Sequence, residues 1–196
     1  MALAQRHRRY GVGMIYLKLR QAGEFINYKR VERLYRLEQL HIRRRRRKKI
    51  PVADRQPLIR PAKANEIWSI DFMFDRIASG RTLKCLAIVD DATHEAVAIV
   101  PEHAIGGDHL TRILDGICSQ RGKPNQNAYV ESFNGRQRDE CLNEHWFLNL
   151  KHAKVIIEVR RREYNEERPK KALGGMTPAA YARQLAEKSA RVATGL

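Results

Sequence analysis

Hydrophobic positions first recur at helical spacing, between about residues 10 and 40. Gly23 interrupts the pattern, and Asn27 stands where a helix N-cap belongs. The apolar positions, three or four apart within two groups, are Ile15, Leu19, Val31, Leu34, Tyr35 and Leu40. This pattern predicts two short helices joined near Gly23.

From Trp68 the period changes from helical to alternating. Apolar and polar residues alternate over 68–74, an apolar run covers 83–89, and a third apolar segment covers 96–100, with turn residues between them. This predicts a three-stranded antiparallel meander. Asp71 stands inside the first strand, where an ionised carboxylate among Ile70, Phe72 and Met73 is costly unless a cation offsets it. An acid facing a sheet edge or a basic side chain is the ordinary alternative.

Helical patterns return after the strands. We expect helices over about 108–120, around Glu131, over 151–164, and from Thr177-Pro178 onward after the Gly174-Gly175 break. The expected apolar positions of the first and third of these helices are Leu110, Ile113, Leu114, Ile117, Val155, Ile156 and Val159. Strands followed by helices place the chain in the α/β class.

The net charge of the chain indicates the kind of partner that it binds. Lys and Arg number 38 against 22 Asp and Glu, which gives a net charge of +16 and favours a polyanionic partner. DNA, RNA and an anionic membrane surface all fit the charge alone. An RNA-binding protein would interleave stacking aromatics with its basic residues, whereas Trp68, Phe72 and Phe74 share one strand face and are expected in the core.

Basic residues gather in two places near the N-terminus. Lys29, Arg30, Arg33 and Arg36 lie on the second predicted helix, which indicates a helix-turn-helix laid on DNA or, alternatively, a helical hairpin with a solvated side. The second place is an unbroken basic run, expected to be a linker that follows the DNA backbone or else a solubilising or targeting segment. Its members are Arg43, Arg44, Arg45, Arg46, Arg47, Lys48 and Lys49.

Membrane insertion and metal-binding cysteines are not expected. The chain has no run near the ~20 apolar residues of a membrane span, so we expect an intracellular soluble protein. Cys85, Cys118 and Cys141 are odd in number and far apart. They are expected to be buried thiols, without structural zinc.

The helix around Glu131 carries Glu131, Asn134 and Arg138 on one stripe, because they lie three and four residues apart. An acid, an amide and a cation on one stripe can hold a divalent metal beside a phosphodiester. Asn134 and Arg138 are then candidate DNA contacts. A solvated charged face is the alternative reading of the helix alone.

In their order along the chain, seven short motifs make this sequence resemble the integrase-type transposases of bacterial insertion sequences. The motifs are 9–11 (Arg-Tyr-Gly), 27–31 (Asn-Tyr-Lys-Arg-Val), 68–72 (Trp-Ser-Ile-Asp-Phe), 88–91 (Ile-Val-Asp-Asp), 127–135 (Asn-Ala-Tyr-Val-Glu-Ser-Phe-Asn-Gly), 164–169 (Tyr-Asn-Glu-Glu-Arg-Pro) and 172–178 (Ala-Leu-Gly-Gly-Met-Thr-Pro). The resemblance implies a ribonuclease H-like integrase core preceded by a small helical DNA-binding segment. It implies that Asp71 and Glu131 are catalytic acids that bind Mg²⁺ or Mn²⁺, and that Arg138 contacts the element end.

The second acid of the family's three is missing here. In the family it lies in an Asp-Asn-Gly stretch before the glutamate helix, but Glu131 follows Asp71 by only 60 positions. A two-cation centre built as in the family needs about 35 more residues between them. We hypothesise an in-frame deletion with its seam near 122–126, which removes the second acid and leaves an unpaired sheet edge. The possible substitutes are Asp90, Asp91, Asp108 and Asp115.

These observations predict four regions and a defective enzyme. The regions are a helix-turn-helix-like segment (1–42), a basic and proline-containing linker (43–64), a truncated core (65–170) and a helical tail (171–196). The expected function is DNA transposition, with catalysis lost in this copy. A DNA-binding module that interferes with an intact transposase and a remnant without function are the alternatives. Expected partners are DNA, further copies or intact transposase subunits, in the bacterial cytoplasm at the nucleoid.

Overall fold

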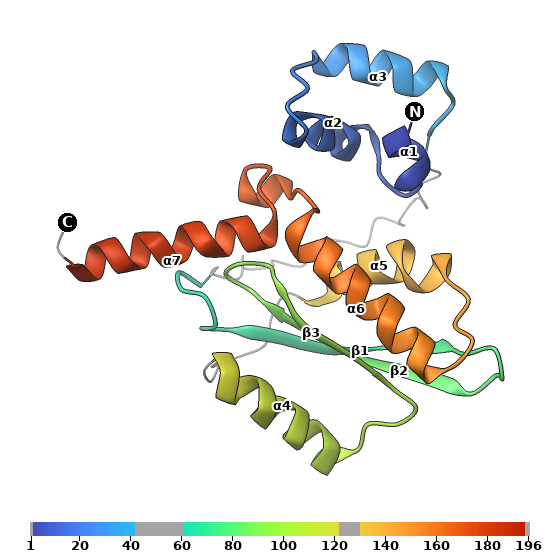
Figure 1. Ribbon diagram of the computed structural model, residues 1–196, viewed down its shortest axis with the longest axis vertical. Helices are drawn as coiled ribbons and strands as arrows, with labels where there is room; N and C mark the ends of the chain where they lie inside the picture. Colours follow the sequence, from blue (N-terminus) through green and yellow to red (C-terminus); the bar gives the residue numbers. More distant parts are fainter. Residues whose placement is uncertain (1, 42–60, 122–129, 195–196) are drawn as a thin grey trace, which may run out of the picture. The chain divides into compact units, whose positions relative to one another are not determined.

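The computed structural model describes residues 2–41, 61–121 and 130–194, and the chain divides into two compact units, Met1–Pro57 and Leu58–Leu196 (Figure 1). Each unit has its own hydrophobic core. The first unit is helical, whereas the second combines a sheet with helices.

The first unit packs α1 (Ala2–Arg6), α2 (Val12–Gln21) and α3 (Tyr28–Leu37) around a small core. The core residues are Tyr10, Ile15, Val31 and Tyr35. The Tyr35 hydroxyl donates a hydrogen bond to the Tyr10 carbonyl at 3.1 Å, which ties α3 to the segment before α2.

Both predicted helices of this unit are confirmed, together with their boundary signals. Gly23 follows α2 with φ +81°, a conformation that glycine adopts without strain. The Asn27 side chain accepts from the Lys29 amide at 2.9 Å, as an N-cap does. Helix α1 was not predicted, and Leu34 is 47% exposed rather than in the core.

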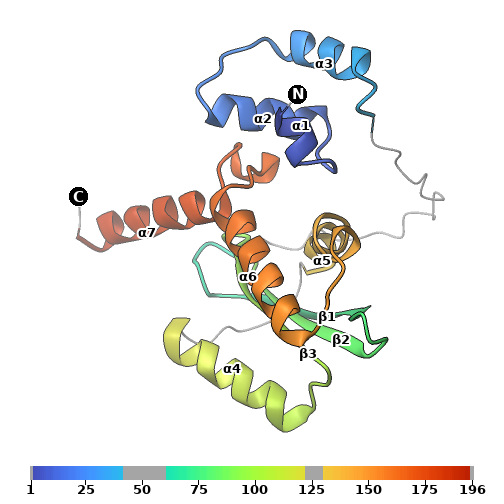
Figure 2. The same ribbon diagram turned by 45° about the vertical axis from the view of Figure 1, so that its right-hand side comes forward.

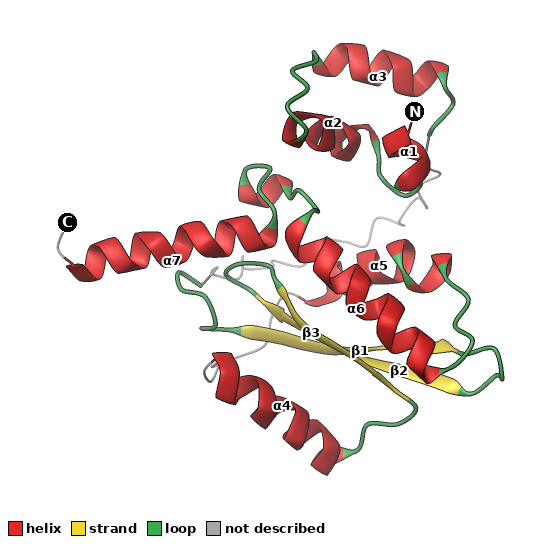
Figure 3. Ribbon diagram, viewed as in Figure 1, coloured by secondary structure: helices red, strands yellow, loops and turns green. Residues whose placement is uncertain are grey.

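The second unit contains a three-stranded antiparallel sheet in the order β1 (Trp68–Arg76), β2 (Thr82–Asp90), β3 (Ala96–Glu102) (Figure 3). The register places Trp68 opposite Asp90 and Asp71 opposite Ala87. The predicted meander is confirmed. Strand β2 is buried on both faces, as its continuous apolar run indicates.

Helices cover both faces of the sheet (Figures 1 and 2). Helix α4 (Gly107–Arg121) packs its expected apolar positions on the face formed by Trp68, Ile70 and Phe72. Helices α5 (Val130–Glu140) and α6 (Leu150–Glu166) pack on the opposite face, with Met73. Phe74 was expected in the core but is 53% exposed. It lies near the end of β1, beyond Ile70 and Phe72, which pack beneath α4.

The C-terminal part consists of α6, two short 3-10 turns at Leu142–Glu144 and Lys171–Leu173, and α7 (Pro178–Thr194). The Thr177 hydroxyl accepts from the Ala180 amide at 3.2 Å, which confirms the expected start of the last helix. Val155 and Val159 were expected to be buried but are exposed. The buried stripe of α6 is instead Ala153, Ile157 and Tyr164.

Two further expectations concern the cysteines and membrane insertion. Cys85 and Cys141 are buried free thiols, as expected, and Cys118 on α4 is half-buried. Within the described ranges, none of the helices has the length and apolar character needed to cross a membrane.

Candidate functional site

Asp71 lies on β1 with both carboxylate oxygens in hydrogen bonds. One oxygen accepts from the Phe72 amide at 2.7 Å, and the other accepts from the Asn134 side-chain amide at 2.7 Å. Asp71 is exposed and lies on an edge strand, so its carboxylate is not embedded among apolar neighbours and the alternative of an acid facing a sheet edge is the correct one. The reason is its position: β1 pairs with β2 on one side only in the described sheet.

Helix α5 brings two of the predicted site residues to β1. Asn134 reaches Asp71, and the Arg138 guanidinium donates to the Phe74 carbonyl at 3.1 Å. Glu131 lies on α5 one turn before Asn134, and its side chain falls outside the described residues. Asn134 and Arg138 of the predicted stripe therefore face the strand that carries Asp71, where they bind protein atoms.

The outer edge of β1 is capped by side chains. The Asp71 carboxylate accepts from the Phe72 amide, the Asp75 carboxylate accepts from the Arg76 amide at 2.8 Å, and Arg138 donates to the Phe74 carbonyl. These backbone groups lie at alternate residues, so they point to the same side of the strand, away from β2. We call Asp71, Asp75 and Arg138 the β1 edge caps.

Sequence reasoning missed Asp75. The sequence spacing could have identified it. Asp75 follows Asp71 by four residues on the same strand, so the two side chains lie on the same face of that strand. An aspartate can accept a hydrogen bond from a backbone amide close to it in sequence, so two of them can shield one strand edge.

Asp90 and Asp91, two of the possible substitutes for the missing acid, serve the fold. Asp90 is 1% exposed and accepts from the amides of Ala92 at 2.9 Å and Thr93 at 2.8 Å, and also from the Asn65 amide. Asp91 accepts from the Ser69 hydroxyl at 2.6 Å. Because Asp90 is opposite Trp68, it lies three residues along the ladder from Asp71, a distance of about 10 Å.

The other two possible substitutes lie across the sheet. Asp108 and Asp115 belong to α4, which covers the face opposite to α5. The sheet therefore separates them from Asn134 and from the helix that carries Glu131.

The described residues do not fit a two-cation centre. Asp71 is a single carboxylate, and each of its oxygens already accepts one hydrogen bond, from the Phe72 amide and from the Asn134 side-chain amide. Two divalent cations need several anionic oxygens between them. In the ranges that the structure describes, no three His, Cys, Asp or Glu side chains group together as metal ligands.

A buried ionic cluster holds α5 in place. Glu140, at the end of α5, pairs with Arg160 of α6 at 2.5 Å and with Arg168 at 2.5 and 3.0 Å. All three side chains are at most 11% exposed, so removal of one partner would leave a buried charge unpaired. Phe133 adds an edge-to-face contact with Tyr164, with ring centroids 4.9 Å apart.

The motif at 164–169 is accordingly structural. Burial raises the pKa of Tyr164 to about 12, so its hydroxyl stays protonated. The Asn165 amide accepts from the Ala96 amide at 2.8 Å and donates to the Ala96 carbonyl at 3.0 Å. Arg168 completes the cluster with Glu140.

The basic residues of α3 lie on two different faces. Lys29, Arg33 and Arg36 form an exposed stripe turned away from the buried Val31 and Tyr35. Arg30 instead borders an apolar groove in the same unit. The basic run 43–49 lies outside the described residues.

Comparison with protein-family models finds an HTH-like domain over residues 1–49 and integrase core domains over 61–137 and 116–178. The chain is also 40% identical to a 31.7 kDa protein of insertion element IS407 from Burkholderia multivorans, over 92% of this chain and 78% of that protein. The chain belongs to the insertion-sequence transposases with an integrase core. A mixed α/β fold with a three-stranded antiparallel sheet is consistent with their ribonuclease H-like core.

Two further relatives support this assignment. The chain is 39% identical to a 39.2 kDa protein of insertion element IS476 from Xanthomonas euvesicatoria, over 92% of this chain and 62% of that protein. It is 43% identical to the low calcium response locus protein T of Yersinia pestis, over 46% of this chain and 65% of that protein. No solved structure matches the chain.

The alignment with the IS407 protein contains a length difference. It spans 215 positions, whereas 92% of this 196-residue chain is about 180 residues, so about 35 positions stand opposite gaps in this transposase. The IS476 protein gives the same difference, with 215 positions and 92% coverage. The transposase is therefore shorter than both relatives within the aligned region.

Proposed function

We propose that this transposase-family chain binds DNA through its first unit but does not cut it, because the deletion has removed the second catalytic acid. The supporting observation is the deficit of about 35 aligned positions against both relatives, which equals the length expected to be missing between Asp71 and Glu131. We place the seam near 122–126, in the region 116–137 where the two integrase core matches overlap.

The environment of Asp71 supports the same proposal. Asp71 and Glu131 are the family's first and third acids at matching positions, yet both Asp71 oxygens already accept hydrogen bonds. In this copy Asp71 acts as an edge cap, and Asn134 and Arg138 hold the exposed edge of β1 instead of an element end. Magnesium or manganese would be bound by the intact family members, in which the counterparts of Asp71 and Glu131 supply two of the three acids.

DNA binding is expected to reside mainly in residues 1–64. The exposed stripe of Lys29, Arg33 and Arg36 supplies positive charge for phosphate contacts, and Arg36 also pairs with Glu32 of the same helix at 3.0 Å. The basic run from Arg43 to Lys49 follows this helix in the sequence and adds seven further positive charges. A chain that occupies element ends without cutting them competes with an intact transposase, so we expect it to inhibit transposition of a related element.

A nicking assay tests the catalytic half of this proposal. Supercoiled plasmid is incubated with Mn²⁺ and either this chain or a repaired chain, in which the aligned segment of the IS407 protein is inserted after Pro124. Only the repaired chain is expected to nick, and Glu131→Gln in the repaired chain should abolish the activity. Nicking by the unrepaired chain that disappears in its own Glu131→Gln variant would overturn the proposal, because another acid would then complete the centre.

A binding titration tests the DNA half independently. Fluorescence anisotropy with element-end DNA should show that Lys29→Ala and Arg33→Ala each weaken binding and lower the salt slope by about 1. Arg183 is an exposed arginine on α7, so Arg183→Ala removes the same charge away from α3 and should leave binding unchanged. Equal effects of Arg33→Ala and Arg183→Ala would assign binding to overall charge rather than to α3.

A further inference from the structure

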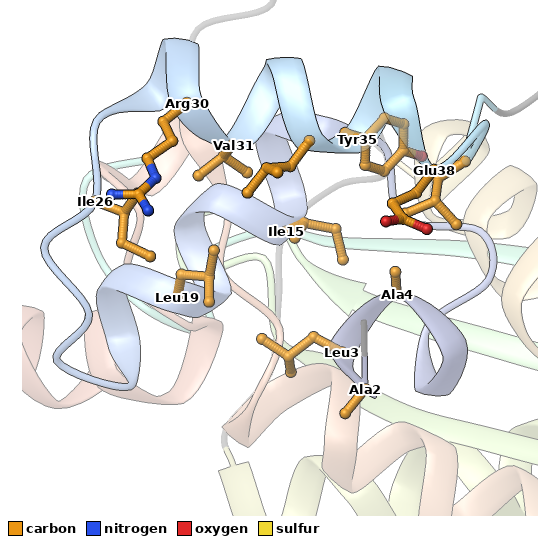
Figure 4. A pocket seen from close by; sticks show the side chains of 12 residues that line it. Ala2, Leu3, Ala4, Ile15, Leu19, Ile26, Arg30, Val31, Tyr35 and Glu38 are labelled. Atoms are coloured by element: carbon orange, nitrogen blue, oxygen red, sulfur yellow. The ribbon is translucent and has the colours of Figure 1, made fainter.

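The first unit contains an apolar groove of about 500 Å³ between its three helices (Figure 4). Leu3 of α1 and Ile15 and Leu19 of α2 face α3 across it, and Val31 and Tyr35 come from α3 itself. The remaining lining residues include Leu34, which is 47% exposed. Leu37, 69% exposed, follows Leu34 on α3. Exposed leucines beside an apolar groove mark a surface that a partner covers.

Opposite charges stand at the two ends of this groove. Arg30 and Glu38 both line it and lie at opposite ends of α3 in Figure 4. Eight residues separate them, which corresponds to about 12 Å along a helix. Among the described residues neither side chain has an ion-pair partner.

The position of Leu34 makes this charge pattern self-complementary. Leu34 is four residues from Arg30 and four from Glu38, so all three share one ridge of α3. Suppose that the α3 helix of a second copy crosses this one in the antiparallel direction, with a two-fold axis at Leu34. Arg30 of each copy would then lie opposite Glu38 of the other copy. The same axis would set Val31 of each copy near Leu37 of the other. A two-fold contact uses one patch twice, as this pattern requires.

We propose that two copies of this chain pair through α3, with Leu34 at the two-fold axis and two Arg30–Glu38 ion pairs at the ends of the contact. The inference is independent of the proposed loss of catalysis. Lys29, Arg33 and Arg36 lie on a different face of α3, so pairing leaves both basic stripes exposed. DNA is not the occupant of the groove, since its walls are apolar and its two charges cancel.

Sedimentation of the full chain with charge-reversal variants tests the pairing. Arg30→Glu and Glu38→Arg alone each create two like-charge contacts, and each should raise the dimer dissociation constant at least about tenfold. The double variant Arg30→Glu/Glu38→Arg restores both pairs and should return the constant toward that of the parent. Arg33→Glu makes the same charge change on the basic stripe and is the matched control, with no expected effect.

A crosslinking measurement makes the test independent of affinity. In a Cys118→Ser background, Leu34→Cys places two thiols across the proposed axis and should give an interchain disulfide on mild oxidation, whereas Arg33→Cys should not. Circular dichroism melting confirms that each variant is folded. A parent chain that stays monomeric at high concentration, equal weakening by Arg30→Glu and Arg33→Glu, or equal crosslinking at positions 33 and 34 would each overturn the proposal.

Discussion

The two outer edges of the sheet are closed in different ways. At β3, the amide and carbonyl of Ala96 bind the Asn165 side chain, and Arg161 adds a bond to the same carbonyl at 3.0 Å. Asn165 is 6% exposed, so this cap belongs to the protein interior. At β1, the caps are Asp71, Asp75 and Arg138, which are exposed or half-exposed.

This difference shows which edge of the sheet is closed by the protein interior and which edge could still accept another strand. A buried cap is part of the core, because loss of its partner leaves polar groups away from water. When an exposed cap is lost, water can take over its hydrogen bonds at little cost. Another strand can also displace an exposed cap and pair with the edge. The β1 edge therefore has the character expected where the proposed deletion removed a neighbouring strand.

The largest expected effect is a difference in thiol reactivity between the buried Cys85 and Cys141 and the half-buried Cys118. Burial raises the pKa of Cys85, opposite Met73 of β1, to about 12 from 9.0, and burial likewise raises the pKa of Cys141 to about 12. At pH 8 their thiolate fraction is then about a thousandfold below that of an unperturbed thiol. Titration with DTNB should show one fast thiol, Cys118, and two slow ones. Cys118→Ser should remove the fast phase, and rapid reaction of all three would show that the core between the sheet and helices α5 and α6 is open to solvent.

Matched asparagine variants test the comparison in terms of stability. Asn165→Ala leaves the Ala96 amide and carbonyl without this partner in a buried site and should lower the free energy of unfolding by about 2–4 kcal/mol. Asn134→Ala removes only an exposed bond to Asp71 and should cost less than about 1 kcal/mol. Urea unfolding of both variants measures the difference. Equal costs would mean that the two edges are closed equally firmly.

Removal of an exposed β1 cap should change association more than stability. Arg138→Ala frees the Phe74 carbonyl, so we expect a stability loss below about 1 kcal/mol but faster aggregation through strand pairing. Light scattering over time, beside urea unfolding, separates the two effects. Arg183→Ala controls for the lost charge, and aggregation no faster than in this control would argue against a pairing-competent edge.

The smallest expected effect concerns acid stability near the β3 edge. Hydrogen bonds from Arg161 chiefly, and also from Arg162, lower the pKa of Glu158 to about 2 from 4.5. The folded pKa lies below the unfolded one, so the stabilisation is present above pH 4.5 and is lost as the pH falls from 4.5 toward 2. Glu158 is 38% exposed, which limits the contribution to about 1 kcal/mol or less. Glu158→Gln should flatten this part of the stability–pH curve, with Glu187→Gln on α7 as control.

Local features were predictable from the sequence. The Asn27 cap, the turn at Gly23, the three strands and the stripe that brings Asn134 and Arg138 to one side of a helix all follow from spacing within a few residues. The errors concern burial. Val155 and Val159 are apolar yet exposed, and Asp71 lies on an open edge, because burial depends on which distant segment packs on each face.

By itself, the sequence determined the family, the α/β class, the order of the elements and the basic character that suits DNA, because these depend on residue types and their periodicity. The tertiary structure decided what the polar residues do. Asp71 became an edge cap, Asn165 closed β3 across 69 positions of sequence, and Arg30 was separated from Lys29 and Arg33. Hydrogen bonds and burial join residues far apart in the chain, so only their placement in space assigns these roles.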